Sequence, residues 1–272
     1  MTIRKIIHLA DIHIRTYRMH EEYKEVFEQL ITEVKDYSSD YEYDELRIVI
    51  VGDLVHQKIT ISNELLLLGT WFLKELLKIS PVVLVAGNHD LLENNKGRLD
   101  SISPMVELID NPNLIFYKES KCYLDDNIVW CNYSIFDNNE RPDIEAYKSE
   151  NKNDDVTYIG LYHAPIVGAT TDIGYEFTEG TTVEHFDGCQ MVLCGDIHKR
   201  QNFEYKGIPI VMPSSLIQQN FGETVSRHGY LIWDVESRTY IEKDIDTRYG
   251  FYKFNIKSLD DIENGNEKLV NG

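Results

Sequence analysis

The sequence predicts an α/β protein, and two observations carry that prediction. Over the first ninety residues, short apolar runs alternate with longer stretches in which apolar residues recur at helical spacing. Such alternation builds parallel strands joined by crossover helices. In the second half the apolar runs are shorter and more hairpin-like, which predicts a mixed sheet there.

The elements of the first half follow in order from this pattern. We expect strands and helices in alternation over residues 3–10, 19–34, 46–51, 63–79 and 82–86. The stretch 63–79 carries apolar residues over more than the single stripe that a surface helix needs. This helix is therefore either sandwiched between the sheet and a neighbouring helix or offers a dimer face.

The second half is less regular. After about Leu114 we expect short strands that include 208–212, 228–233 and 239–243. The segment 138–155 is polar and without periodicity, so we interpret it as a surface insertion.

The charge balance limits the kinds of ligand that the surface can attract. The chain of 272 residues has 46 acidic and 27 basic side chains, for a formal net charge of −19. A nucleic-acid binder that relies on its own basic surface has the opposite balance. A polyanionic substrate must therefore be held by metal ions, by a local basic patch or by a partner.

Cysteine usage and hydropathy point to an intracellular protein. The four cysteines form no Cys-x-x-Cys pair, and two lie in or beside apolar runs, so we expect reduced, packed thiols. No apolar stretch approaches the roughly eighteen residues of a membrane span. We therefore expect no membrane association and a cytoplasmic location.

Residues of the types that bind metals follow five of the apolar runs. Chemistry in open α/β sheets is placed where strands end in loops. The residues concerned are Asp11 and His13; Asp53; Asn88, His89 and Asp90; His163; and Asp196 and His198. One such residue alone says little, and a lone His163 is more often a hydrogen-bonded core residue than a ligand. All five groups in order favour a metal-dependent hydrolase.

The ligand types indicate which ions would bind. Carboxylate, amide oxygen and imidazole together suit hard-to-borderline divalent ions such as Mn²⁺ or Fe²⁺. Two ions about 3.5–4 Å apart can clamp a phosphoryl group and stabilise the attacking and leaving oxygens. One carboxylate must then bridge the ions, and Asp53 is our choice. The metals would supply positive charge where the chain is negative.

These motifs resemble the ordered signature of the calcineurin-like metallophosphoesterases. Within that family the chain looks most like the SbcD nucleases, the bacterial and phage double-strand-break repair exonuclease subunits, over about residues 3–245. The marks are Leu9-Ala10-Asp11-Ile12-His13, Gly52-Asp53-Leu54-Val55-His56, Lys199 after His198, and the segment 213–223. The resemblance implies a four-layer α-β-β-α sandwich of two mixed sheets flanked by helices.

The resemblance also implies two ligand sets that share one aspartate. The first ion would be held by Asp11, His13, Asp53 and His198. The second would be held by Asp53, Asn88, His163 and the residue at position 196. That last position is a histidine in the family pattern and is Asp196 here, which adds negative charge and favours harder cations. The alternative is that Asp196 lies outside the ligand set and the site is weakened.

Three further residues receive roles from the same resemblance. His89 matches the residue that protonates the leaving oxygen, and an imidazole can exchange a proton near neutral pH. Asp90 is expected to orient its ring. His56 matches a histidine that handles the DNA phosphate or strand beside the metals.

The function implied is that of a manganese-dependent DNA exonuclease and endonuclease subunit. It would hydrolyse phosphodiester bonds with two Mn²⁺ ions, with Mg²⁺ or Fe²⁺ as alternatives, in DNA repair, recombination or replication. The expected partners are DNA, an SbcC-like ATPase and a second copy of the chain bound through helix 63–79. The composition suggests an AT-rich genome, such as that of a phage acting in the host cytoplasm.

Domain organisation follows from the extent of the resemblance. We expect a nuclease domain over 1–246 and a C-terminal stub over 247–272, with the family's capping domain absent or truncated. Two other functions remain open at this point. One is a phosphodiesterase or phosphatase for small phosphoesters, and the other is a degenerate, non-catalytic subunit that binds DNA or a partner, for which Asp196 is the only support.

Overall fold

The computed structural model describes residues 2–152 and 155–252. Its first sheet has six strands in the order β12-β11-β1-β2-β3-β4. Their bounds are Lys5–Leu9 (β1), Leu46–Val51 (β2), Val82–Val85 (β3), Leu114–Tyr117 (β4), Gly229–Asp234 (β11) and Thr239–Asp244 (β12). Strands β1 to β4 are parallel to one another, whereas β11 pairs antiparallel with β1 and with β12. The predicted parallel sheet is therefore mixed, because the last two strands extend it beyond β1.

The second sheet also has six strands, in the order β5-β6-β7-β8-β10-β9. Their bounds are Lys121–Asp125 (β5), Ile128–Tyr133 (β6), Thr157–His163 (β7), Met191–Gly195 (β8), Gln201–Tyr205 (β9) and Ile208–Met212 (β10). The four central strands run parallel, and the edge strands β5 and β9 are antiparallel to their neighbours. The mixed sheet predicted for the second half is confirmed.

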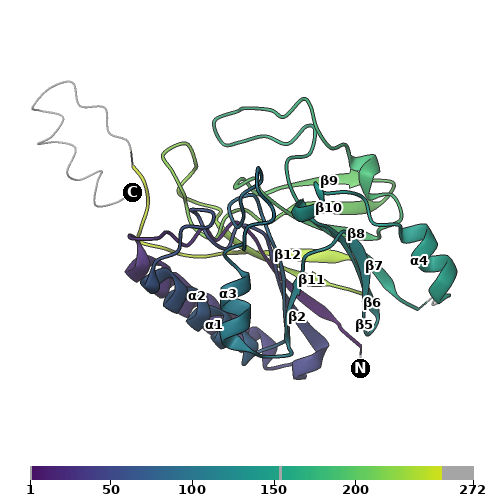
Figure 1. The fold of residues 1–272 in the computed structure, drawn as a ribbon, viewed down its shortest axis with the longest axis horizontal. Coiled ribbons are helices and arrows are strands. Elements are labelled where there is room, and N and C mark those ends of the chain that lie inside the picture. Colours follow the sequence, from purple (N-terminus) through teal and green to yellow (C-terminus); the bar gives the residue numbers. More distant parts are fainter. Residues whose placement is uncertain (1, 153–154, 253–272) are drawn as a thin grey trace, which may run out of the picture.

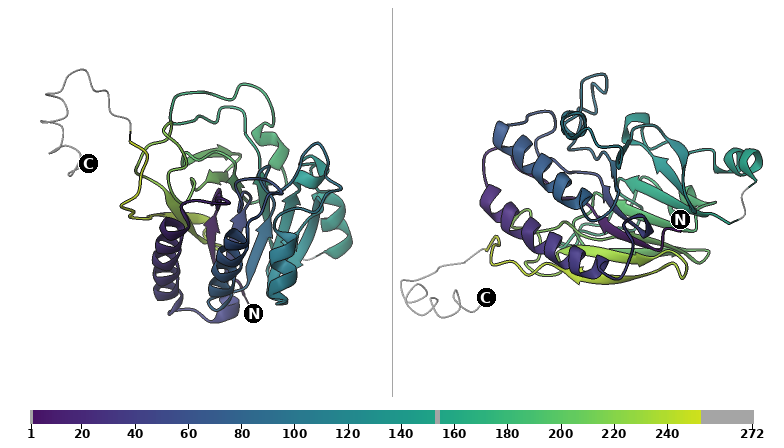
Figure 2. Two further views of the ribbon diagram at one scale, coloured as in Figure 1. Left: turned by 60° about the vertical axis from the view of Figure 1, so that its left-hand side comes forward. Right: turned by 90° about the horizontal axis from the view of Figure 1, so that it is seen from below.

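The helices lie outside the two sheets (Figures 1 and 2). Their bounds are His20–Ser38 (α1), Asn63–Leu77 (α2), Ser103–Ile109 (α3) and Ile144–Asn151 (α4), with short 3₁₀ turns at Tyr43–Glu45, Ile135–Asp137 and Val183–Phe186. Helices α1 to α3 cover the first sheet and α4 lies beside the second, which gives the four-layer sandwich. Helix α2 packs against both α1 and α3. Helix α2 is therefore packed between the sheet and neighbouring helices, the first of the two alternatives for residues 63–79.

Three apolar clusters lie between these layers. One fills the space between α1 to α3 and the first sheet, and includes Phe27 and Phe72, whose rings stack 3.9 Å apart. The second lies between the two sheets and includes Trp130 and Trp233. The third covers the outer face of the second sheet, where α4 contributes Ile144. The outer layer on that side is thin, because α4 is the only α-helix there among the described residues.

The chain outside the sheets includes a helix that the sequence did not predict. The segment 138–155 is not wholly irregular, since it contains α4, and the Asp143 carboxylate caps that helix by accepting a bond of 2.9 Å from Ala146 N. Such an Asx cap gives a polar segment a helix start without an apolar stripe. Most of the expected C-terminal stub, residues 253–272, lies outside the described residues. Among those described, no helix combines the length and apolar character needed to cross a membrane.

The topology brings the predicted metal-binding residues together. Strands β1, β2 and β3 of one sheet and β7 and β8 of the other end at the same edge of the sandwich. The loop after β1 is held to the loop after β2 by backbone bonds from His13 N to Asp53 O (2.8 Å) and from Ile14 N to Leu54 O (2.9 Å). All five sequence motifs therefore meet at one place.

Candidate metal centre

Four of the predicted ligands sit in the left-handed region of backbone space. The φ angles are 52° for Asp11, 54° for His13, 54° for Asp53 and 80° for Asp196. This conformation costs an L-residue about 1–2 kcal/mol, and Asp and Asn tolerate it best because their short polar side chains bond locally. Backbone strain of this kind gathers at functional sites, where the surrounding structure enforces it.

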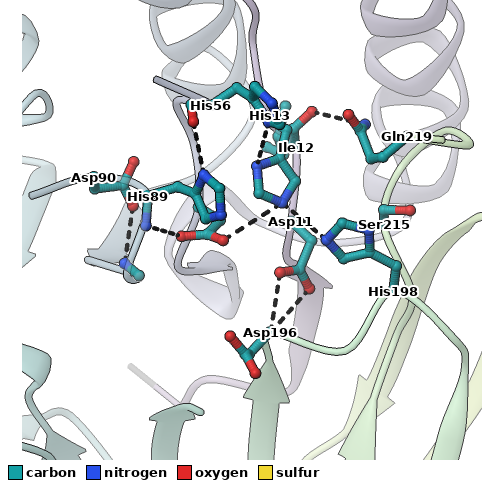
Figure 3. A network of polar contacts seen from close by, with 12 residues as sticks. Asp11, Ile12, His13, His56, His89, Asp90, Asp196, His198, Ser215 and Gln219 are labelled. Atoms are coloured by element: carbon teal, nitrogen blue, oxygen red, sulfur yellow. Dashed lines mark hydrogen bonds and ion pairs between the residues drawn. The ribbon is translucent and has the colours of Figure 1, made fainter. Parts of the chain in front are cut away.

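Histidines dominate one half of the site (Figure 3). His13 Nε2 lies 2.9 Å from His198 Nε2 and 3.4 Å from Asp53 Oδ2. On its other edge, His13 Nδ1 lies 3.3 Å from His56 Nδ1. Two ring nitrogens this close must share a proton or face a common cation. Because burial holds the pKa of His13 well below its usual value, its ring is neutral and able to act as a ligand.

His163, Asn88 and Asp196 form the other half. His163 Nδ1 lies 2.7 Å from the Val51 carbonyl, so this nitrogen donates its proton and Nε2 is left as the atom that would bind a metal. Nε2 is buried without a hydrogen-bond partner, and so is Oδ1 of Asn88. Two buried, unpaired atoms in one place are a cost unless a ligand satisfies them.

Asp53 lies between the two halves. Its Oδ2 faces His13 at 3.4 Å, and its Oδ1 faces His163 at 3.4 Å. The backbone N–H of His89 donates to Oδ1 at 2.8 Å, which fixes the carboxylate plane. One oxygen toward each half is the orientation that a bridging ligand requires.

Close approach of the backbone creates the pocket around His163. A Cβ on Gly87 would lie 2.2 Å from Asp53 Oδ1 and 2.5 Å from His163 Nε2. A Cβ on Gly52 would lie 2.0 Å from His163 Nδ1, and φ at Gly52 is +78°. The glycines that precede the Asp and Asn motifs are thus needed because any side chain there would displace the imidazole.

Asp196 reaches this second half. Its Oδ1 lies 3.8 Å from His163 Nε2, and its N–H donates to both carboxylate oxygens of Asp11 at 3.0 and 3.2 Å. Burial is the main reason that the pKa of its carboxyl is raised. Asp196, which stands where the family pattern has a histidine, therefore lies beside the other donors.

The electrostatics of the site suit a bound cation. Burial raises the pKa of Asp11 to about 7. Burial lowers the pKa of His163, but the carboxylates around it, Asp53 first, raise it more, so that it lies well above its usual value. For Asp53, burial acts upward, but His163 and His13 lower its pKa further than burial raises it. The acids and imidazoles thus hold protons where a divalent ion would compete for them.

His89 and His56 lie at the solvent side of the histidine half. Their rings stack 5.2 Å apart, and the His13 ring meets that of His89 edge-on at 4.8 Å. Burial, with a smaller contribution from the charge of Arg15, lowers the pKa of His56 to about 4. His56 is therefore neutral at working pH.

The expected role of Asp90 is wrong. Its carboxylate accepts backbone N–H bonds from Val55 and Gly87, both at 2.9 Å, and no bond joins it to the His89 ring among the described residues. His89 Nδ1 is oriented by the carbonyl of His56, at 2.7 Å. Asp90 is buried beneath the loops and ties them together, so sequence adjacency to His89 suggested the wrong partner.

Glu223 is the residue whose role the sequence did not reveal. Its Oε1 lies 2.7 Å from His198 Nδ1, and its Oε2 accepts from Gln219 N at 2.6 Å. A carboxylate on the far nitrogen of a ligand histidine fixes the tautomer and makes the ring a better donor. Burial lowers the pKa of His198, but the bond to Glu223 contributes most to raising it, to about 9. The one sign in the sequence that Glu223 belongs to the site is its position in the 213–223 segment.

The donor set therefore fits two divalent ions. Among the described residues, the groups able to hold a metal are Asp11, His13 and His198; Asp11, Asp53 and His163; and His13, His56 and His89. The first group is the predicted first set without Asp53, the second joins Asp11 to Asp53 and His163 of the predicted second set, and Asp11 therefore occurs in both. Each of the seven predicted ligands lies at this site, where the orphaned atoms of Asn88 and His163 offer further evidence for a cation.

A cavity of about 490 Å³ opens beside the second half. Asn88, Asp196 and His198 contribute to its lining, and Lys199 is the one lysine or arginine there. Ile173 and Phe177 from the segment between β7 and β8 contribute apolar wall. A cavity of this size takes a nucleotide-sized group rather than a phosphate alone.

A four-layer sandwich with acids and imidazoles gathered at its strand ends is the architecture of a metal-dependent hydrolase. The chain belongs to the calcineurin-like phosphoesterase family, whose model matches residues 4–200.

Individual relatives add little detail. An uncharacterised protein of Acanthamoeba polyphaga mimivirus is 35% identical over 254 residues, which is 92% of this chain. The chain spans only 18% of the length of that relative. Solved structures with similar folds include the phosphopantetheinyl hydrolase of Mycobacterium tuberculosis, at 14% identity and a TM-score of 0.45, covering 79% of this chain and 90% of the other. A second is an archaeal phosphodiesterase, at 12% identity and 0.41, covering 87% and 97%.

Proposed function

We propose that this chain is a metal-dependent DNA phosphodiesterase, a nuclease of the SbcD type. The observation that carries the hydrolytic part is the orientation of Asp53, which turns one carboxylate oxygen toward each half of the site. Asp11, His13, Asp53 and His198 would hold one ion, and Asp53, Asn88, His163 and Asp196 the other. Bound divalent ions would activate water and neutralise charge on a phosphoryl group.

The side chains around the ligands support this chemistry. His89 is held by the His56 carbonyl at Nδ1, which leaves Nε2 to carry a proton to a leaving oxygen. His56 is neutral beside it, with its ring stacked on that of His89, and we propose that it contacts the substrate strand. Glu223 would keep His198 oriented when the substrate binds.

DNA is the substrate that the sequence motifs favour, and the cavity beside the metals is large enough for a nucleotide. Mn²⁺ is the ion that we propose, because the combined donor set mixes imidazole with oxygen ligands. An SbcC-like ATPase would supply the basic DNA-binding surface that a chain of charge −19 lacks. A homodimer through α2 stays a prediction, to which Leu67, 72% exposed on that helix, lends some support.

A phosphodiesterase for small phosphoesters is the second candidate. The net charge of −19 favours it, because an acidic surface repels DNA but only weakly affects a substrate with one phosphate. The degenerate-subunit alternative rests on Asp196 alone, and the position of its carboxylate, 3.8 Å from His163 Nε2, weighs against it.

The experiment compares two substrates with one protein. Purified protein with Mn²⁺ is given double-stranded DNA and bis-p-nitrophenyl phosphate, with and without its ATPase, and His89→Ala serves as the control for contaminating nuclease. We expect DNA cleavage that His89→Ala abolishes. Hydrolysis of the small ester without cleavage of DNA, even with the ATPase present, would favour the second candidate.

A further inference from the structure

The described part of the chain buries three arginines, and one of them differs from the others. Arg47 forms a two-pronged ion pair with Asp125, with bonds of 2.7 and 2.8 Å. Arg200 contacts Asp244 at 2.6 Å and Glu242 at 3.1 Å. Arg15 is only 6% exposed, yet none of the ion pairs among the described residues includes it. An unpaired buried charge is costly, so its missing partner needs an explanation.

The groups that contact Arg15 are neutral. Its Nη2 donates to the backbone carbonyl of Gln219 at 2.8 Å and to Oε1 of the same residue at 3.3 Å. Its Nε is buried without a hydrogen-bond partner. The guanidinium is therefore positioned by Gln219 and by the hydroxyl of Tyr23, both neutral, and no carboxylate among the described residues neutralises it.

Arg15 stands at the edge of the metal centre. Ile14 and Val55 form a parallel bridge, and His56 N donates to Ile14 O at 3.1 Å. Arg15 follows Ile14 and His56 follows Val55, so Arg15 and His56 lie on neighbouring backbone segments at the histidine half of the site. The 490 Å³ cavity lies elsewhere, because its lining includes Asn88 and Asp196 but neither Arg15 nor His56.

We propose that Arg15 binds a phosphate of the substrate adjacent to the phosphate that is hydrolysed. This inference rests on the proposed function and deepens it, because it selects substrates that carry at least two phosphates, as a polynucleotide does. A guanidinium presents paired donors that match the geometry of a phosphate. On a chain of charge −19, one fixed cation beside the metals gives such a substrate a second point of attachment.

The two-phosphate model makes Arg15 a positioning residue rather than a catalytic one. The substrate would lie across the site, with one phosphate at the ligands around Asp53 and the next at Arg15. The contact with Arg15 then increases the binding affinity of a substrate with two phosphates, and it does not increase the affinity of a substrate with one.

The test measures binding, so it does not depend on hydrolysis. Calorimetry with Mn²⁺-loaded protein compares thymidine 3′,5′-bisphosphate with the 3′- and 5′-monophosphates. We expect the wild type to bind the bisphosphate about tenfold to a hundredfold more tightly, the size of a charged hydrogen bond. Arg15→Gln should abolish this ratio, and Arg18→Gln, which removes the same charge from an exposed neighbour, should preserve it.

Using a ratio separates substrate binding from structural support. If Arg15 only anchored Gln219, its loss would weaken all three nucleotides equally and leave the ratio intact, which would overturn the proposal. So would a wild type that binds the bisphosphate no better than the monophosphates. Should Arg15→Gln fail to fold, Arg15→Lys keeps the charge but not the paired donors, and a reduced ratio is then the expected result. Absence of phosphodiesterase activity would refute the proposed function without altering these ratios.

Discussion

The two halves of the metal centre hold their ligands by different means. In the histidine half, His198 is 22% exposed at its side chain and is oriented by another side chain, Glu223. In the other half, His163 is 1% exposed and is oriented by the backbone carbonyl of Val51, with glycine backbone packed around its ring. The ring of His198 is thus held by another side chain close to solvent, whereas the ring of His163 is held by the backbone in the interior.

The donor atoms differ in the same way. Besides the shared Asp53, the first half offers the imidazoles of His13 and His198 with one carboxylate, Asp11, and the second offers one imidazole with the oxygens of Asn88 and Asp196. Oxygen ligands favour harder cations. The two ions should therefore differ in affinity and in exchange rate, although they share Asp53.

The largest expected effect follows from removing the shared ligand. Asp53→Asn should eliminate both ions, because each half loses an anionic donor, and activity should fall by more than about 10⁴, the upper limit for loss of a general acid. Metal stoichiometry by inductively coupled plasma mass spectrometry checks this. Asp246→Asn, on an exposed residue, is the control. Retention of one tightly bound ion would show that the halves are independent.

His89→Ala should separate proton transfer from metal binding. We expect kcat to fall by about 10²–10⁴ with both ions retained, because the ring contacts the site through Nδ1 and the His56 carbonyl rather than as a required ligand. Steady-state kinetics and the same stoichiometry measurement check this. Loss of an ion in this variant would instead make His89 a ligand.

Glu223→Ala should affect the histidine half alone. Loss of a carboxylate behind a ligand histidine costs about 10–100-fold in metal affinity. Titration of metal-free protein should show one weakened site and one unchanged site, with exposed Glu236→Ala as the control. Equal weakening of both sites would argue against two separately supported halves.

The smallest effect is one of pH on thermal stability. The pKa of Asp11 is raised to about 7 and that of His198 to about 9 in the metal-free protein. Groups with raised pKa values lose their stabilising protonated form as pH rises, through 7 for Asp11 and through 9 for His198. Metal-free protein should thus lose stability from pH 6 to 8, while Mn²⁺ binds better as protons leave.

Scanning calorimetry with and without Mn²⁺ at pH 6 and pH 8 measures this. The rise in Tm caused by Mn²⁺ should be larger at pH 8, by about 2–4 °C for each 1 kcal/mol of added binding free energy. A Tm increment that is the same at both pH values would show that neither proton competes with the metal.

Much of the site could be predicted because strand ends carry its ligands. The apolar runs located β1, β2, β3, β7 and β8, and the residue after each run is fixed in space by the topology of a parallel sheet. Asp53, our choice for the bridge, turns one carboxylate oxygen toward each half. The strands β11 and β12 were found as well, but the sequence gives no sign that they join β1.

Contacts between loops were harder to predict. Glu223 lies 25 residues from His198 and meets it only because the 213–223 segment folds back over the site. The same applies to Arg15, whose lack of a carboxylate partner is visible only when its neighbours are known. The error over Asp90 has this origin too, since its partners are backbone groups of other loops.

A crystal structure of the protein soaked in Mn²⁺ tests the central claim most directly. Anomalous scattering should show two peaks, each next to one oxygen of Asp53, with His13 and His198 on one and His163, Asn88 and Asp196 on the other. A single peak, or a second ion that contacts neither Asp53 nor Asp196, would contradict a site built from two unlike halves around one shared aspartate.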